Sequence, residues 1–99
     1  MSTDLKNATR IAIKLKEPQL YKVILLNDDY TPMDFVAGLL IDLFHKSLPE
    51  AQCITLDIHE NGRGVAGIYT KEIAEQKVID VALVAGHYSH PLISTIEPN

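Results

Sequence analysis

The densest group of chemically capable side chains is the run Asn27-Asp28-Asp29, which directly follows a nearly continuous apolar segment. Two adjacent carboxylates at the end of a buried strand can bind a metal cation or an amine, or act as acid and base. Asn and Asp also end strands, because their side chains hydrogen-bond the local backbone in turns. Three polar residues in a row are more than a turn needs, so a binding role stands beside the turn role.

A second group is formed by Thr55, Ile58 and His59, whose spacing of three and four residues places them on one face of a predicted helix. We expect this face to be offset from a core stripe through Ala51 and Ile54. An apolar face with an imidazole, beside an acidic turn, would form an apolar recess with a polar rim, as selective small-ligand sites do. The alternative is a surface histidine that complements the dipole at a helix end.

Met33 and Val36 lie three residues apart at the start of another predicted helix, next to the acidic run. They are candidates for the wall of the same recess. Their alternative role is ordinary core packing, in which methionine commonly fills gaps.

The residues give little support for a metal site or for catalysis. No two of the four histidines have the four-residue spacing of a helical metal site, and the single cysteine, Cys53, allows neither a disulfide nor a paired-cysteine zinc site. We expect Cys53 to be a structural thiol in an apolar helix. Asp28, Asp29 and His59 would suit a hydrolase, but the chain has no serine elbow and no phosphate-binding glycine loop. We therefore expect no metal, no cofactor and no enzyme activity.

Composition narrows the class of protein further. The 99 residues include 9 basic and 13 acidic side chains, and this net charge of −4 argues against a general binder of nucleic acid or anionic membranes. The longest apolar run, residues 35–41, is far shorter than a membrane span. Residues 1–10 do not have the pattern of a secretory signal, so we expect a protein of the reducing cytoplasm.

The apolar pattern of the sequence predicts the helices and strands that must position these side chains. They follow one another in the order β-α-α-β-α-β and form a single α+β domain, with a three-stranded antiparallel sheet packed on three helices. Thr31 and Pro32 begin the first helix, and Ser47 with Pro49 begins the second. Gly62 ends the second helix in a left-handed conformation. The predicted bounds are strands at 21–26, 65–69 and 92–96, and helices at 32–46, 49–59 and from 71 to near 87.

The first residues differ from this domain. Residues 1–17 are mostly polar, but Ile11, Ile13 and Leu15 alternate with less apolar neighbours as in a strand. This segment is either a flexible tail or an edge strand or docking peptide for a partner. We place the domain at residues 20–99 and the tail at residues 1–19.

The longest of these motifs carries a family resemblance. The run Asn27-Asp28-Asp29-Tyr30-Thr31-Pro32-Met33, with the strand before it, resembles the ClpS family of protease adaptors. The similarity continues through residues 67–70, 74–78 and 90–92, and covers about residues 20–97. The resemblance implies a binding module with a fold similar to the C-terminal domain of a ribosomal stalk protein.

The same resemblance implies the ligand, the partner and the site. Members bind the free N-terminal residue of N-degron substrates, chiefly Leu, Phe, Tyr or Trp, and deliver them to the N-terminal domain of a Clp AAA+ unfoldase of ClpA or ClpC type. The matching positions for the α-amino group are Asn27, Asp28 and His59. Those for the side-chain pocket are Asp29, Thr31, Met33, Val36, Thr55, Ile58 and Leu92. Glu72 and Lys77 match unfoldase contacts, and residues 1–19 match a mobile tail used in delivery.

One position departs from the family pattern. Thr55 stands where a larger apolar residue, often methionine, is expected. A shorter wall would widen the pocket or make it more polar. The alternative function is therefore a binding domain of the same fold with altered pocket specificity and a different partner.

Overall fold

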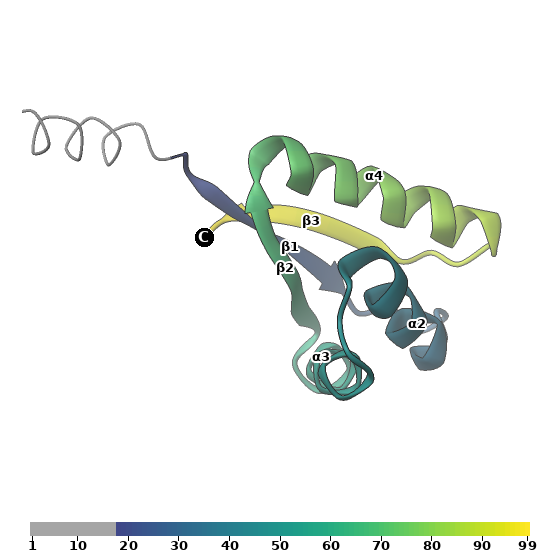
Figure 1. Ribbon diagram of the computed structural model, residues 1–99. Coiled ribbons are helices and arrows are strands. Elements are labelled where there is room, and N and C mark those ends of the chain that lie inside the picture. The colour runs from purple at the N-terminus through teal and green to yellow at the C-terminus, as the bar shows by residue number, and fades with distance from the viewer. Residues whose placement is uncertain (1–17) are drawn as a thin grey trace, which may run out of the picture.

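The computed structural model describes residues 18–99 and contains six elements (Figure 1). In chain order they are β1 (Leu20–Leu26), α2 (Met33–Phe44), α3 (Leu48–Asn61), β2 (Arg63–Thr70), α4 (Lys71–His87) and β3 (Ile93–Pro98). This order confirms the predicted α+β class. The tail expected at residues 1–19 lies outside the described residues, except for the exposed Pro18 and Gln19.

The three strands form one antiparallel sheet with β1 in the centre and the order β2-β1-β3. Leu20, at the start of β1, pairs with Thr70, and Leu26, at its end, pairs with both Arg63 and Ile93. The register with β2 shifts between Val23 and Ile24, which leaves Ala66 as an extra residue in β2. Such a bulge increases the local twist of a strand.

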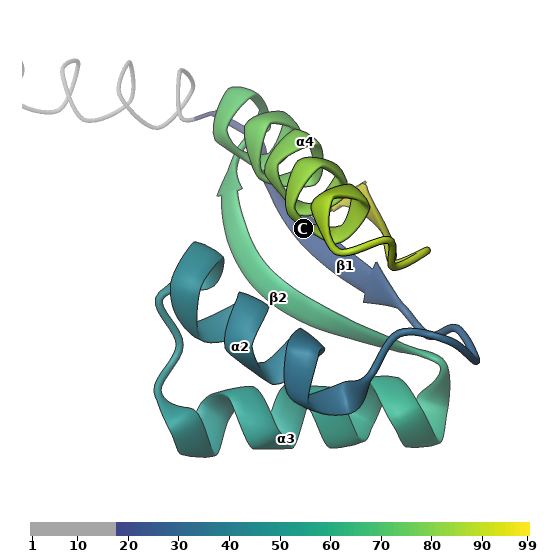
Figure 2. The ribbon, with the colours of Figure 1, turned by 90° about the vertical axis from the view of Figure 1, so that its right-hand side faces the viewer.

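The core lies between the sheet and the helices. Figure 2 shows α2 lying between α3 and α4, with α4 running along the strands. Val23 and Leu25 of the central strand are completely buried against this helical layer. The helices contribute these buried residues to the same cluster: Val36, Leu39, Leu40, Phe44, Ala51, Ile58, Ala74, Val81 and Ala85. The predicted apolar stripe of the last helix is confirmed, with Val78 packed at its margin.

The other face of the central strand carries Ile24, which is fully buried yet is not part of the helix-packed cluster. Arg63 and Glu97 form an ion pair of 2.7 Å between β2 and β3, the strands on either side of β1. Since their pairing partners on β1 are Leu26 and Lys22, this ion pair passes over Ile24. The long side chains therefore cover an apolar residue on the face of the sheet that none of the helices α2, α3 and α4 covers.

The helix ends agree with the sequence only in part. Ser47 caps α3 in a capping box with Glu50, and Gly62 ends that helix at a φ of 86°, as predicted. The start predicted for the first helix is wrong by one residue, because Pro32, not Thr31, is the N-cap of α2. The hydroxyl of Thr31 donates to Asp28 instead, at 2.8 Å. The last strand begins at Ile93, which leaves Leu92 in the loop before it.

Candidate functional site

A recess lies where the end of β1, the start of α2, the second half of α3 and the loop before β3 meet. Its cavity volume is about 20 Å³. Its lining residues are Leu26, Asn27, Asp28, Thr31, Met33, Val36, Thr55, Ile58, His59 and Leu92. These include nine of the ten pocket residues predicted from the sequence. The tenth, Asp29, is exposed and does not line the recess.

One backbone hydrogen bond joins the two polar groups of the recess. The N–H of Asn27 donates to the carbonyl oxygen of Gly62 at 2.9 Å, which ties the end of β1 to the residue that ends α3. His59 lies in the last turn of α3, so this bond brings the acidic run and the imidazole to the same rim. Val36, Ile58 and Leu92 are each at most 6% exposed and form an apolar floor beneath that rim.

The carboxylate of Asp28 organises the turn between β1 and α2. Its Oδ1 accepts from the backbone N–H groups of Tyr30 at 2.8 Å and Thr31 at 2.7 Å, while Oδ2 accepts from the hydroxyl of Thr31 at 2.8 Å. A carboxylate has about four acceptor sites, so three are occupied by the turn and one remains. The predicted turn role is confirmed, and the geometry leaves room for a ligand donor as well.

The charge of Asp28 is stabilised by these contacts. Burial on its own would raise the pKa of Asp28, but the hydrogen bonds from Thr31 and Tyr30, with the attraction of His90, together outweigh it. The pKa of Asp28 therefore lies below its ordinary value of 3.8. At neutral pH the rim carries a fixed negative charge, which favours a cationic ligand.

Two further acceptors follow from the chemistry of the rim. An ionised carboxylate only accepts, so the Thr31 hydroxyl must donate its proton to Asp28 and keep its oxygen lone pairs for another partner. His59 is exposed, and its ring takes part in none of the side-chain hydrogen bonds among residues 18–99. A neutral imidazole there has one free acceptor nitrogen.

Thr55 lies differently from its predicted position. Instead of being offset from the core stripe, it is 6% exposed and shares the buried stripe of α3 with Ala51 and Ile58. Its Oγ1 donates to the carbonyl oxygen of Ala51 at 2.6 Å. This bond satisfies the hydroxyl inside the helix, so Thr55 brings no free donor to the recess.

The recess is narrow in this conformation. A cavity of about 20 Å³ has room for roughly one water molecule. A bulky side chain therefore enters only if a wall moves. Met33 is the wall residue at the mouth, is 40% exposed and has a flexible unbranched side chain.

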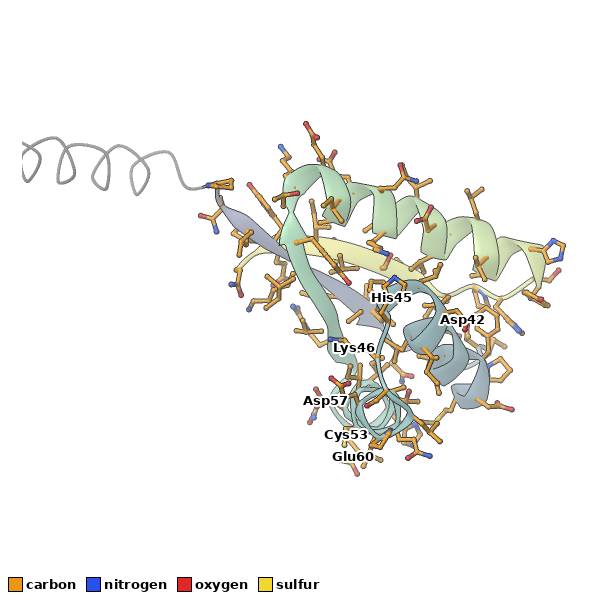
Figure 3. All side chains as sticks on the ribbon, in the orientation of Figure 1. Asp42, His45, Lys46, Cys53, Asp57 and Glu60 are labelled. Carbon is orange, nitrogen blue, oxygen red and sulfur yellow. The ribbon has the colours of Figure 1, made fainter. Side chains whose placement is uncertain are left out.

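Other residues singled out in the sequence lie elsewhere. Glu72 is exposed in the first turn of α4, whereas Lys77 points inward and donates to the carbonyl oxygen of Leu43 at 2.6 Å. Cys53, expected as a structural thiol, lies on α3, and its side chain is exposed on the outer side of that helix (Figure 3).

Two residues of the site were not predicted as part of it. Leu26 lines the recess, and its place directly before Asn27 at the end of a buried strand is the signal that could have found it. His90 acts on the charge of Asp28 and packs edge-on against Phe35 with ring centroids 4.6 Å apart. Only the fold brings it there, because more than sixty residues separate the two in sequence.

Within residues 18–99 there is no group of three metal-ligating side chains, and no helix there is long and apolar enough to cross a bilayer.

Comparison with known proteins gives consistent matches. Residues 16–95 match the family model of the ATP-dependent Clp protease adaptor protein ClpS. A ClpS adapter protein of Acetivibrio thermocellus is 49% identical over 86 residues, 87% of each chain. One from Campylobacter jejuni subsp. doylei is 50% identical over 96 residues, 94% of this chain and 97% of that one. Among solved structures, Agrobacterium tumefaciens ClpS2 bound to L-phenylalaninamide has a TM-score of 0.80 and 36% identity, covering 84% of this chain and all of that one.

Proposed function

This chain belongs to the ClpS family of adaptor proteins of the ATP-dependent Clp protease, and from that premise we propose how it works. It is an adaptor and not an enzyme. It binds the free N-terminal residue of N-degron substrates, with Leu, Phe, Tyr or Trp as the side chain, in the recess at the end of β1. It delivers these substrates to a Clp unfoldase for proteolysis.

The rim suits a free α-amino group. An ammonium has three donors and needs three acceptors. Asp28 offers its remaining acceptor site and a charge, and His59 and the Asn27 side chain offer an imidazole nitrogen and an amide oxygen. Thr31 offers a hydroxyl oxygen whose own proton is already committed to Asp28. An acetylated terminus has lost the charge and two of the donors, and would leave these acceptors unpaired.

The floor suits a bulky apolar side chain. Val36, Ile58 and Leu92 are apolar and buried, and Met33 stands at the mouth. Burying a Leu or Phe side chain is worth on the order of 1.5–3 kcal/mol. The similar Agrobacterium tumefaciens ClpS2 is solved with L-phenylalaninamide, a ligand that carries a free amine next to an aromatic side chain.

The partner is the N-terminal domain of a Clp unfoldase of ClpA or ClpC type, contacted through the exposed Glu72 on α4, with Lys77 as the second predicted contact. We place the protein in the cytoplasm.

The observation that carries the proposal is the coexistence of a fixed carboxylate charge, free acceptors and a buried apolar floor in one recess. The test is a fluorescence titration with two peptides that begin with Leu and differ only in N-terminal acetylation. We expect the free peptide to bind and the acetylated one to lose at least about 100-fold in affinity, as unpaired buried polar groups imply. Equal affinities would refute the proposal.

The alternative of an altered pocket with a different partner rests on Thr55 alone. Because the hydroxyl of Thr55 is held by Ala51, the wall at this position stays apolar and is only shorter. The same class of ligand therefore fits, and the N-degron function is favoured.

A further inference from the structure

A second hollow lies beside the recess, between α2 and α3. This α2/α3 groove has a volume of about 630 Å³. Its apolar lining consists of Met33, Ala37, Gly38, Ile41, Leu48 and Leu56. Leu48 is 57% exposed and Leu56 52%, so two leucines of one helix face water along the same groove. An exposed apolar surface of this kind marks a site of interaction.

The groove adjoins the recess. Met33 and Thr55 line both, one from α2 and one from α3. Met33 is one of the exposed residues of the recess, and the groove begins at the same side chain, so a chain that leaves the recess on this side meets the groove. The chain that follows the first residue is therefore the occupant nearest to the groove.

Small residues open the groove along α2. Gly38 lies in the middle of the helix, and a Cβ built on it would meet no atom within 4 Å. No contact among residues 18–99 requires glycine at this position, although glycine weakens a helix relative to alanine. Because Gly38 and Ala37 have no large side chain, another backbone or side chain can approach this side of α2 closely.

The reach of a peptide fits this arrangement. An extended chain advances about 3.3–3.6 Å per residue and points successive side chains to opposite sides. Residues two to four of a substrate therefore emerge within roughly 4 to 11 Å of the recess, where the groove lies.

We propose that the α2/α3 groove is an accessory substrate site that takes one bulky apolar side chain from positions two to four of the substrate. This inference rests on the proposed function, because the recess must hold the first residue. It predicts that the adaptor prefers substrates with a second apolar residue shortly after the N-terminal one.

The test uses a peptide series with free N-terminal Leu followed by serines, in which one Leu is moved through positions two, three and four. We expect one position to tighten binding by about fivefold over the all-serine peptide, the gain from burying part of a leucine side chain. The double variant Leu48→Gln, Leu56→Gln should reduce that gain below about twofold and leave the affinity for the all-serine peptide unchanged.

The matched control removes two equally exposed apolar side chains from another surface. Ile79→Gln with Leu83→Gln on α4, at 52% and 67% exposure, should keep the full gain. The unchanged affinity for the all-serine peptide also shows that each variant is folded.

The possible results distinguish a failure of the groove as a substrate site from a failure of the proposed N-degron function. If no position tightens binding, if the gain survives in the groove variant, or if the α4 control loses it equally, the groove is not a substrate site. If wild type does not bind the all-serine peptide, the proposed function itself fails. Sedimentation velocity tests whether a second copy of the chain occupies the groove. If the wild type and the α4 control are dimers and the groove variant is a monomer, the inference is overturned.

Discussion

The carboxylate of Asp28 accepts three hydrogen bonds from the turn it belongs to and at the same time borders the recess. The two roles can be distinguished by a substitution that removes the charge of the side chain and keeps its shape. An asparagine keeps an oxygen for the N–H groups of Tyr30 and Thr31, but it has no charge and places an NH₂ where Oδ2 accepts from the Thr31 hydroxyl. Substitution by asparagine therefore tests the charge with little change in shape.

Asp28→Asn is expected to lower the free energy of unfolding by about 1 kcal/mol at pH 7, because charge-assisted hydrogen bonds are lost. The folded-state pKa of Asp28 lies below 3.8, so its stabilising contribution is present above that ordinary value and is lost as the pH falls through the lowered pKa. Urea unfolding of both proteins from pH 7 to pH 2 should show their difference shrinking below pH 4. A difference that stays constant over this range would contradict the assigned charge.

Thr55→Met is expected to change the order of affinity among peptides that begin with Leu, Phe, Tyr or Trp. The longer side chain fills part of a recess that is already narrow, so the largest ring, Trp, should lose most relative to Leu. Fluorescence titrations with one peptide per terminus measure the order. Cys53→Met, on the exposed side of the same helix, is the control and should leave it unchanged. An unchanged order in Thr55→Met as well would remove Thr55 from the pocket.

Single residues also show where sequence reasoning fell short. The spacing of Thr55, Ile58 and His59 placed them near one another, and all three line the recess, but the core stripe was expected to pass through Ala51 and Ile54 and so to leave Thr55 aside. The hydrogen bond from Thr55 to the carbonyl oxygen of Ala51 hides the polarity of its side chain and lets Thr55 share the buried stripe. A side-chain bond to the backbone one turn away leaves no sign in the periodicity of a sequence.

At the level of the elements, local signals predicted α3 better than α2. Ser47 and Glu50 form a capping box that depends only on residues within one turn, so the sequence contains all of it. The start of α2 depends on which partner the hydroxyl of Thr31 takes. It donates to Asp28 in the preceding turn and does not cap the helix. The order of the elements was predictable from periodicity, whereas the meeting of Asn27 with Gly62 depends on the complete fold.

Glycine has a different position in two of the helices: Gly38 lies within α2, whereas Gly62 ends α3. Gly38→Ala is expected to raise the free energy of unfolding by about 0.5–1 kcal/mol, because the new methyl group meets nothing and alanine favours the helix. Gly62→Ala is the matched comparison and should destabilise the protein by about 1 kcal/mol, because Gly62 has a φ of 86° at the end of α3. Urea denaturation measures both. A loss of stability in Gly38→Ala would show that this helix needs glycine within the chain itself.

At the scale of the whole molecule, the two proposed interfaces lie at opposite ends of the sheet. The recess follows Leu26 at the end of β1, whereas α4 begins directly after Thr70, which pairs with Leu20 at the start of β1 (Figure 1). The seven residues of β1 span roughly 20 Å at 3.3 Å per residue. The sheet thus separates the two proposed interfaces, and we expect substrate and unfoldase to bind at the same time.

This separation predicts that Glu72 and Lys77 respond differently to substitution. Glu72→Lys changes an exposed side chain and should leave stability and peptide affinity unchanged, while weakening binding to the unfoldase N-terminal domain about tenfold by charge reversal. Lys77→Met should instead lower the free energy of unfolding by about 1–2 kcal/mol. Its ammonium bonds to the carbonyl oxygen of Leu43 at 2.6 Å and lies 5.8 Å from the ring centre of Phe44 and 5.7 Å from that of Tyr69.

Urea denaturation, peptide titration and binding of the isolated unfoldase domain, measured on both variants, distinguish the two roles. Lys77 ties α4 to the end of α2, so its removal should loosen the helix that carries Glu72 without touching the recess. If Lys77→Met keeps full stability but loses the unfoldase domain, Lys77 is a direct contact and its internal hydrogen bond is dispensable. If Glu72→Lys weakens peptide binding, the two ends of the sheet are coupled and the adaptor does not hold its partners independently.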